Sequence, residues 1–107
     1  IEMSNQIHVV MVSVPDATVA NQIASALLEQ QLAACVQILP TVRSLYMWEG
    51  KLTEGNEQLL FIKAPQLHYS AIEALVLQLH PYQTPEVITL PVAQGHSAYL
   101  KWIEDVT

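Results

Sequence analysis

The stretch Ile7-His8-Val9-Val10-Met11-Val12-Ser13-Val14 decides the fold that we expect for this chain. It is rich in β-branched residues and almost continuously apolar, so an extended strand here would carry apolar side chains on both faces. Such a strand lies in the middle of a sheet, with helices over one face and other protein over the second. We therefore expect a central strand over residues 7–14 whose two faces are both covered.

Three helices are predicted from apolar stripes at helical spacing. The first follows Pro15 and Asp16, and Asp16 is a favourable N-cap. Its stripe comprises Ala20, Ile23, Ala24, Leu27 and Gln31. The second helix follows Pro65, and its stripe comprises Ile72, Leu75, Val76 and Leu79. A short last helix opens at residues 95–97 and carries an apolar patch of Tyr99, Trp102 and Ile103.

The remaining strands form a long hairpin and a short final strand. The stretch of residues 32–36 is expected to lead into a second strand that runs to Tyr46, with a bulge, a kink or an edge position at Pro40, which cannot donate to a ladder. Gly50 supplies the turn of the hairpin tip. A weak point at Gly55-Asn56 precedes a third strand over residues 57–64, and the fourth strand covers residues 87–90. The hairpin is too long for one small sheet, so we expect its ends to pair with neighbouring subunits.

The order of these elements is β-α-β-β-α-β plus a terminal helix, which is the ferredoxin-like α+β arrangement. We expect one domain over residues 7–107 and a frayed or disordered start over residues 1–6. Both helices of such a fold cover the same sheet face, and the other face is bare in a monomer. Because the first strand is apolar on both sides, this arrangement favours self-assembly.

The composition agrees with assembly and excludes several partners. Of 107 residues, 51% are apolar and only 13% are charged, against the usual ~25%. So many apolar residues cannot all be buried in one small subunit, which favours a closed symmetric homo-oligomer. The formal net charge of −6 argues against nucleic acid and anionic membrane surfaces. No apolar run reaches the ~18 residues that span a bilayer, and a single cysteine, Cys35, is typical of a cytoplasmic protein.

Four blocks of the chain resemble the signature blocks of the CutA family, the divalent-cation tolerance proteins. They are Leu32-Ala33-Ala34-Cys35-Val36, Ser44-Leu45-Tyr46-Met47-Trp48-Glu49-Gly50-Lys51, His80-Pro81-Tyr82-Gln83-Thr84-Pro85-Glu86 and Tyr99-Leu100-Lys101-Trp102. The resemblance implies a homotrimer of ferredoxin-like subunits with PII-like architecture and high stability. It also implies a link to tolerance of copper and other divalent metals.

The chain departs from a copper site suggested for some members of that family. That site combines a cysteine in the first strand with two adjacent histidines before Pro-Tyr. The matching positions here hold Val12 and Leu79, and only His80 remains. The resemblance therefore does not carry a thiolate-bearing copper site over to this chain. A smaller departure is Lys63-Ala64, where the family usually has Lys-Thr.

His80 is the best candidate for a metal ligand, because imidazole is a common donor to copper and zinc. Glu86 or symmetry-related copies would have to complete the site. The competing interpretation is that His80 only caps its helix, and a single ligand favours that interpretation.

Cys35 stands between Ala34 and Val36, which favours a structural role over a ligand or a nucleophile.

A ligand cleft between subunits is the second candidate site. Trp48 and Tyr82 are its expected walls, although interface packing would explain the aromatic residues as well. Glu57 and Lys63 are six residues apart on the third strand, so they share a face. They could bind a polar ligand, act as an acid–base pair or form an intersubunit salt bridge. No phosphate-binding loop, nucleophile elbow or CxxC pair occurs.

The sequence leads to one main hypothesis about function and two alternatives. The main hypothesis is a non-enzymatic cytoplasmic trimer for divalent-cation tolerance, which binds copper, another divalent cation or a small ligand weakly between subunits. Its site residues would be Trp48, Glu57, Lys63, Tyr82 and Glu86 in the cleft and His80 on the metal. The alternatives are an enzyme with Glu57, Lys63 and His80 as acid–base groups, and a trimer that senses small molecules or presents surfaces to a protein partner.

Overall fold

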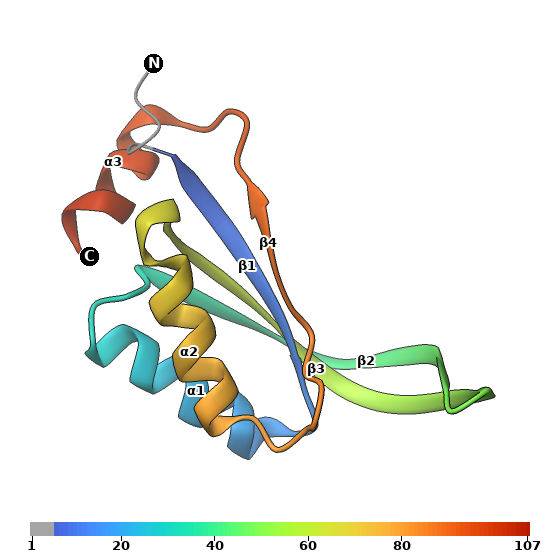
Figure 1. Cartoon of the computed structure of the whole chain (residues 1–107). Coiled ribbons are helices and arrows are strands. Elements are labelled where there is room, and N and C mark those ends of the chain that lie inside the picture. Colours follow the sequence, from blue (N-terminus) through green and yellow to red (C-terminus); the bar gives the residue numbers. More distant parts are fainter. Residues whose placement is uncertain (1–5) are drawn as a thin grey trace.

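The computed structural model describes residues 6–107 and confirms the ferredoxin-like α+β fold with a C-terminal helix (Figure 1). Its elements are β1 (Ile7–Val14), α1 (Ala17–Glu29), β2 (Cys35–Trp48), β3 (Lys51–Pro65), the 3-10 helix η2 (Gln66–His68), α2 (Tyr69–Leu79), β4 (Val87–Pro91) and α3 (Ser97–Asp105). The predicted fraying of residues 1–6 falls outside the described residues except at Gln6. The carbonyl of Gln6 accepts a hydrogen bond from the backbone N–H of Gln66.

β1 lies in the interior of an antiparallel sheet with the strand order β2-β3-β1-β4, as the sequence predicted. Helices α1 and α2 lie side by side over one face of this sheet (Figure 1). The side chain of Asp16 accepts a hydrogen bond from the N–H of Val19, which confirms the predicted N-cap. Gln31 does not continue the stripe of α1, because the helix ends at Glu29 and Gln31 has a left-handed φ of 58°. The core comprises Val10, Val12, Val14, Ala20, Ile23, Leu27, Ala33, Leu60, Ile62, Ala64, Ile72 and Val76.

The second face of the sheet is only partly covered by the chain. Helix α3 packs over one end of it, where Ile103 is buried and the amine of Lys63 lies 5.7 Å from the ring centroid of Tyr99. Further along this face, the side chains of Ile88 and Leu90 on β4 are exposed. The predicted second cover is therefore supplied by the chain itself at one end only.

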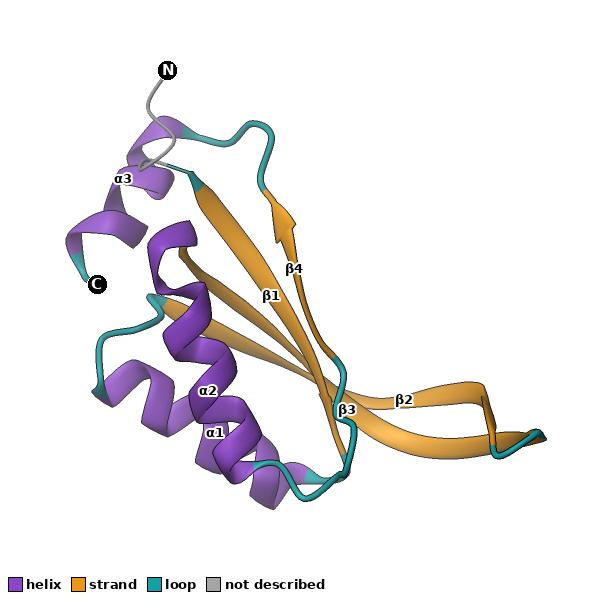
Figure 2. Ribbon diagram, in the orientation of Figure 1, coloured by secondary structure: helices purple, strands orange, loops and turns teal. Residues whose placement is uncertain are grey.

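The β2–β3 hairpin continues past the rest of the sheet as an arm, which we define as residues 42–57. β1 ends with Val14 opposite Gln58, so the strands of the arm pair only with each other (Figure 2). The arm makes the subunit elongated: its radius of gyration is 14.6 Å, against about 13 Å expected for a compact domain of this length.

Most of the local features predicted for the arm are present in the structure. The register between β2 and β3 shifts between Leu39 and Val42, which confirms an irregularity at Pro40. The tip turns at Glu49 and Gly50, whose φ angles of 51° and 78° are those of a two-residue hairpin turn. The predicted weak point at Gly55-Asn56 is wrong, because β3 is continuous from Lys51. Gly55 pairs with Ser44, and a Cβ at that position would meet the Tyr46 hydroxyl at an ordinary contact distance of 3.7 Å.

The core predicts the effect of one truncation. Leu60 is 0% exposed, so Leu60→Ala should lower the free energy of unfolding by about 2–5 kcal/mol through lost burial and the remaining cavity. The matched control is Leu67→Ala on η2, where the leucine is 71% exposed and the expected change is within about 0.5 kcal/mol. Denaturant unfolding at one fixed protein concentration measures both values. Equal losses in the two variants would contradict the assignment of the core.

Candidate functional site

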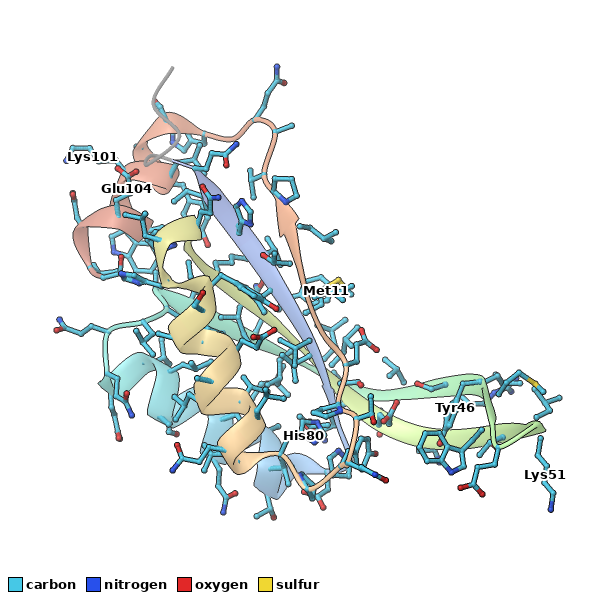
Figure 3. The ribbon with its side chains drawn as sticks, in the orientation of Figure 1. Met11, Tyr46, Lys51, His80, Lys101 and Glu104 are labelled. Atoms are coloured by element: carbon cyan, nitrogen blue, oxygen red, sulfur yellow. The ribbon has the colours of Figure 1, made fainter. Side chains whose placement is uncertain are left out.

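A hollow of about 600 Å³ lies where the arm leaves the sheet and faces the segment of residues 80–86. In Figure 3, Tyr46 lies on the arm side of this region and His80 lies at its base, near the end of β1. The lining residues are Ser13, Ser44, Leu45, Tyr46, Trp48, Glu57, Tyr82, Gln83, Thr84 and Glu86. The site thus joins three segments that are far apart in the sequence: the end of β1, the arm and the connection between α2 and β4.

His80 fixes that connection to the sheet. The residue adopts an extended ψ of 133° before Pro81, so α2 ends at Leu79. Its ring is buried, and Nε2 lies 2.6 Å from the carbonyl oxygen of Ser13 on β1. Nδ1 accepts a hydrogen bond of 3.2 Å from the backbone N–H of Tyr82. Because Nδ1 accepts, Nε2 carries the proton and donates to Ser13.

These contacts bear directly on the hypothesis that His80 binds metal. Both ring nitrogens are engaged, so a metal on either one would leave the Ser13 carbonyl or the Tyr82 amide without its partner. Within residues 6–107, no group of three or more His, Cys, Asp or Glu side chains is placed to hold an ion. Val12 and Leu79, at the positions of the suggested copper ligands, pack in or against the core. Within one chain, the described residues therefore do not fit a tight copper site.

Tyr82 connects the same segment to the arm. Its hydroxyl donates a 3.0 Å hydrogen bond to Oε2 of Glu57 on β3. Burial, followed by the hydrogen bond and the negative charge of Glu57, raises the pKa of Tyr82 to about 12. Tyr46 and Asp16 add to this effect. The hydroxyl therefore remains a hydrogen-bond donor at neutral pH and links the two walls of the hollow.

The structure brings together most of the residues that the sequence proposed for the cleft. Trp48, Glu57, Tyr82 and Glu86 all line the hollow, and His80 supports it from below. Lys63 does not join them, because six residues of extended strand place it about 20 Å from Glu57. It lines a separate hollow of about 220 Å³ beside α3, opposite Cys35 in the register.

The separation of Lys63 has two consequences. The proposed Glu57–Lys63 pair does not form within one chain, since Glu57 bonds to Tyr82 instead. The three acid–base groups of the enzyme hypothesis also do not meet at one place in a single chain. The error arose because an even spacing along a strand fixes the shared face but says nothing about the distance between side chains.

Several residues that line the hollow were not among those predicted for the cleft. Tyr46 and Ser44 precede Trp48 at a spacing of two, and this alternation could have placed them on the wall that holds Trp48. Gln83 and Thr84 belong to the connection already singled out. Ser13 and Leu45 carried no such signal. None of the helices in the described part of the chain is both long and apolar enough to cross a membrane.

Comparisons with known proteins agree with this geometry over nearly the whole chain. Residues 8–106 match the family described as CutA1 divalent ion tolerance protein. The divalent-cation tolerance protein CutA of Pectobacterium atrosepticum is 46% identical over 95 residues, which cover 89% of this chain and 86% of that protein.

Two solved structures are similar in fold as well as in sequence. The divalent cation tolerance protein Cut A1 of Thermus thermophilus has a TM-score of 0.92 and 42% identity, covering 94% of this chain and 98% of that one. A protein of Archaeoglobus fulgidus, described as periplasmic divalent cation tolerance protein CutA, has a TM-score of 0.91 and 30% identity, covering 94% and 97%.

The contact between Tyr82 and Glu57 predicts a pH dependence of stability. Because the pKa of Tyr82 is about 12 in the folded protein and 10.0 ordinarily, the native state holds the phenol proton more tightly. This contribution to stability is fully present below pH 10.0 and is lost as the pH rises to about 12. Tyr82→Phe should therefore flatten the fall in the free energy of unfolding over that range and remove one late step from the tyrosinate absorbance titration.

Tyr69→Phe is the control for this prediction. Burial and a hydrogen bond to Glu73 also raise the pKa of Tyr69, but Tyr69 lies outside the hollow. Its replacement should leave the step at about pH 12 in place. Loss of a step near pH 10.0 in Tyr82→Phe, with the late step kept, would show that the contact with Glu57 does not form.

Proposed function

Because this chain belongs to the family of CutA1 divalent ion tolerance proteins, we propose that it acts in divalent-cation tolerance as a homotrimer that binds a small ligand, without catalysis. The ligand would occupy the hollow between the arm and residues 80–86. The observation that carries this proposal is the hollow itself: about 600 Å³, within the range of small-molecule sites, with aromatic and carboxylate side chains converging on it.

Assembly is supported by the apolar surface that a single chain leaves exposed. A two-stranded hairpin is marginal in water by itself, yet the arm is long and exposes large apolar side chains. These are Leu45, Tyr46, Met47, Trp48 and Leu52. On the second sheet face Ile88 and Leu90 are exposed too. A closed ring in which each arm lies against a neighbouring subunit would cover both regions. That the ring has three subunits is proposed from the resemblance to the family.

Trimerisation would also place the hollow at a subunit boundary. The arm supplies Tyr46, Trp48 and Glu57 to its wall, and the same arm is the part that would contact a neighbouring copy. A ligand bound there would touch more than one subunit. The site proposed from the sequence, a cleft between subunits, then coincides with the hollow of the single chain.

Metal binding in this proposal is weak and does not use His80. The ring of His80 holds the connection after α2 in place, as its bonds to Ser13 and Tyr82 indicate. A divalent cation that entered the hollow would meet the carboxylates of Glu57 and Glu86, which are too few for a tight site. Copper or another divalent cation is thus proposed as a weak occupant.

We propose that the protein is non-enzymatic and cytoplasmic. An enzyme built on Glu57, Lys63 and His80 would need a second subunit to deliver Lys63 to the hollow.

The single cysteine favours a reducing compartment. The relative from Archaeoglobus fulgidus is described as periplasmic, so a fluorescent fusion imaged in the native host is the direct check on location.

Native mass spectrometry tests the assembly and the role of His80 together. We expect a trimer, and we expect Cu²⁺ and Zn²⁺ uptake to be the same in the wild type and in His80→Gln, because the imidazole is occupied by Ser13 and Tyr82. The trimer mass of the variant is the control for folding. A monomer would contradict the assembly, and loss of one metal per subunit in the variant would contradict the structural role of His80.

The ligand site is tested by saturation-transfer NMR with a panel of small metabolites. Compounds that bind should lose their signal in Trp48→Ala, because Trp48 forms a wall of the hollow. Trp102→Ala is the matched control, since Trp102 stacks on Tyr99 in α3, away from the hollow. Binding that survives in Trp48→Ala and disappears in Trp102→Ala would place the site elsewhere.

A further inference from the structure

We propose that the ligand of the hollow is a small alkylammonium cation, held between the aromatic rings of the arm and residues 80–86 and the carboxylates beside them. This inference rests on the ligand-binding function proposed above and adds the chemical class of the ligand. Three features of the hollow support it: the aromatic walls, the sign of the charges and the size.

The aromatic walls come from two sides. Tyr46 and Trp48 are two residues apart on β2, so their side chains lie on one side of the arm, and Tyr82 faces them from the connection after α2. In the single chain the three side chains are 44%, 49% and 40% exposed. The face of an aromatic ring carries partial negative charge and attracts organic cations, and cages of such rings are a common way to bind alkylammonium groups.

All charged side chains that line the hollow are acidic. They are Glu57 and Glu86, and the ten lining residues, all within the described part of the chain, include no Lys, Arg or His. One oxygen of Glu57, Oε2, accepts from Tyr82, which holds this carboxylate at the wall. The charge of Asp16 also acts on the Tyr82 hydroxyl. A ligand in this hollow therefore experiences a negative potential.

The basic side chains of the chain are all engaged or placed elsewhere. Arg43 pairs with Glu54 at 3.3 Å, and Lys101 pairs with Asp105 at 3.1 Å. Lys51 extends from the tip of the arm (Figure 3), and Lys63 lies in the hollow beside α3. Within the described residues of one chain no cation pairs with Glu57 or Glu86, so a bound cation would provide a positive charge that this chain itself does not bring to the hollow.

The size and the remaining groups select an organic cation over a metal ion. A volume of about 600 Å³ far exceeds that of an ion, and aromatic faces do not supply the oxygen ligands that a hard divalent cation needs. An anion would be repelled by the two carboxylates. A neutral apolar ligand would displace water from the two carboxylates without forming a hydrogen bond or an ion pair with them. The hydroxyls of Ser44 and Thr84 can donate a hydrogen bond to a polar end of the ligand or accept one from it.

A charge series of equal shape tests this inference. The probes are choline, its uncharged carbon isostere 3,3-dimethylbutanol and the anion 3,3-dimethylbutyrate, with putrescine as a second cation. Titrations followed by calorimetry or NMR at one ionic strength should give choline about tenfold tighter binding than the neutral isostere, and weaker binding still for the anion. The difference should shrink as salt is added.

The variants separate charge from shape. Glu86→Gln keeps the shape of the side chain and should weaken choline about threefold or more while leaving the neutral isostere unchanged. Glu104→Gln is the matched control, because Glu104 lies on α3, at the end of the molecule far from the arm (Figure 3). Trp48→Ala should abolish the preference for choline.

The outcomes distinguish the class of ligand from the existence of the site. Binding of the isostere or the anion as tightly as choline would overturn the cation class and leave a ligand-binding hollow in place. Failure of choline and putrescine to bind, with other metabolites binding through Trp48, would do the same. If no compound of either experiment depended on Trp48, the proposed function would fail together with this inference.

Discussion

A hydrogen bond of 2.6 Å between the imidazole of His80 and the carbonyl of Ser13 holds the candidate site together. It joins the end of α2 to the end of β1, and the other ring nitrogen of His80 then orients the backbone of Tyr82. Tyr82 in turn reaches the arm through Glu57. These three contacts connect the end of β1, residues 80–82 and the arm, which are the segments that surround the hollow.

The arm poses a separate physical problem. Its strands pair only with each other, and it exposes aromatic and aliphatic side chains that a soluble monomer normally buries. The second face of the sheet has the same feature around Ile88 and Leu90. One assembly would cover both regions at once, which is why the proposed trimer and the proposed ligand site involve the same part of the molecule.

The link between the family and divalent cations does not require a tight metal site in this chain. The positions that a copper site would use hold Val12 and Leu79, both of which serve the core, and His80 has two other partners. Aromatic rings and two carboxylates form a more specific environment for an organic cation than for a metal ion. Any effect of the protein on metal tolerance would then be indirect, through the small molecule that we propose for the hollow.

The sequence by itself determined the order of elements, the central place of β1, the cap at Asp16, the irregularity at Pro40 and the turn at Gly50. These features depend on local backbone preferences and on the period of apolar residues, which neighbours in the chain decide. The sequence also identified correctly four of the five residues that it predicted for the cleft, because they cluster in polar and aromatic segments at the ends of strands. It misjudged Gly55, where the cross-strand pairing of a long hairpin overrides the local weakness of glycine.

Only the tertiary structure decided what His80, Lys63 and Tyr46 do. His80 meets Ser13 across 67 positions of sequence, and Tyr82 meets Glu57 across 25, so no local pattern could show that these groups are already paired. Strand alternation placed Glu57 and Lys63 on one face, but the length of an extended strand keeps them in different hollows. A sequence shows which side chains share a face, whereas the distances between them, and hence their chemistry, follow from how distant segments pack.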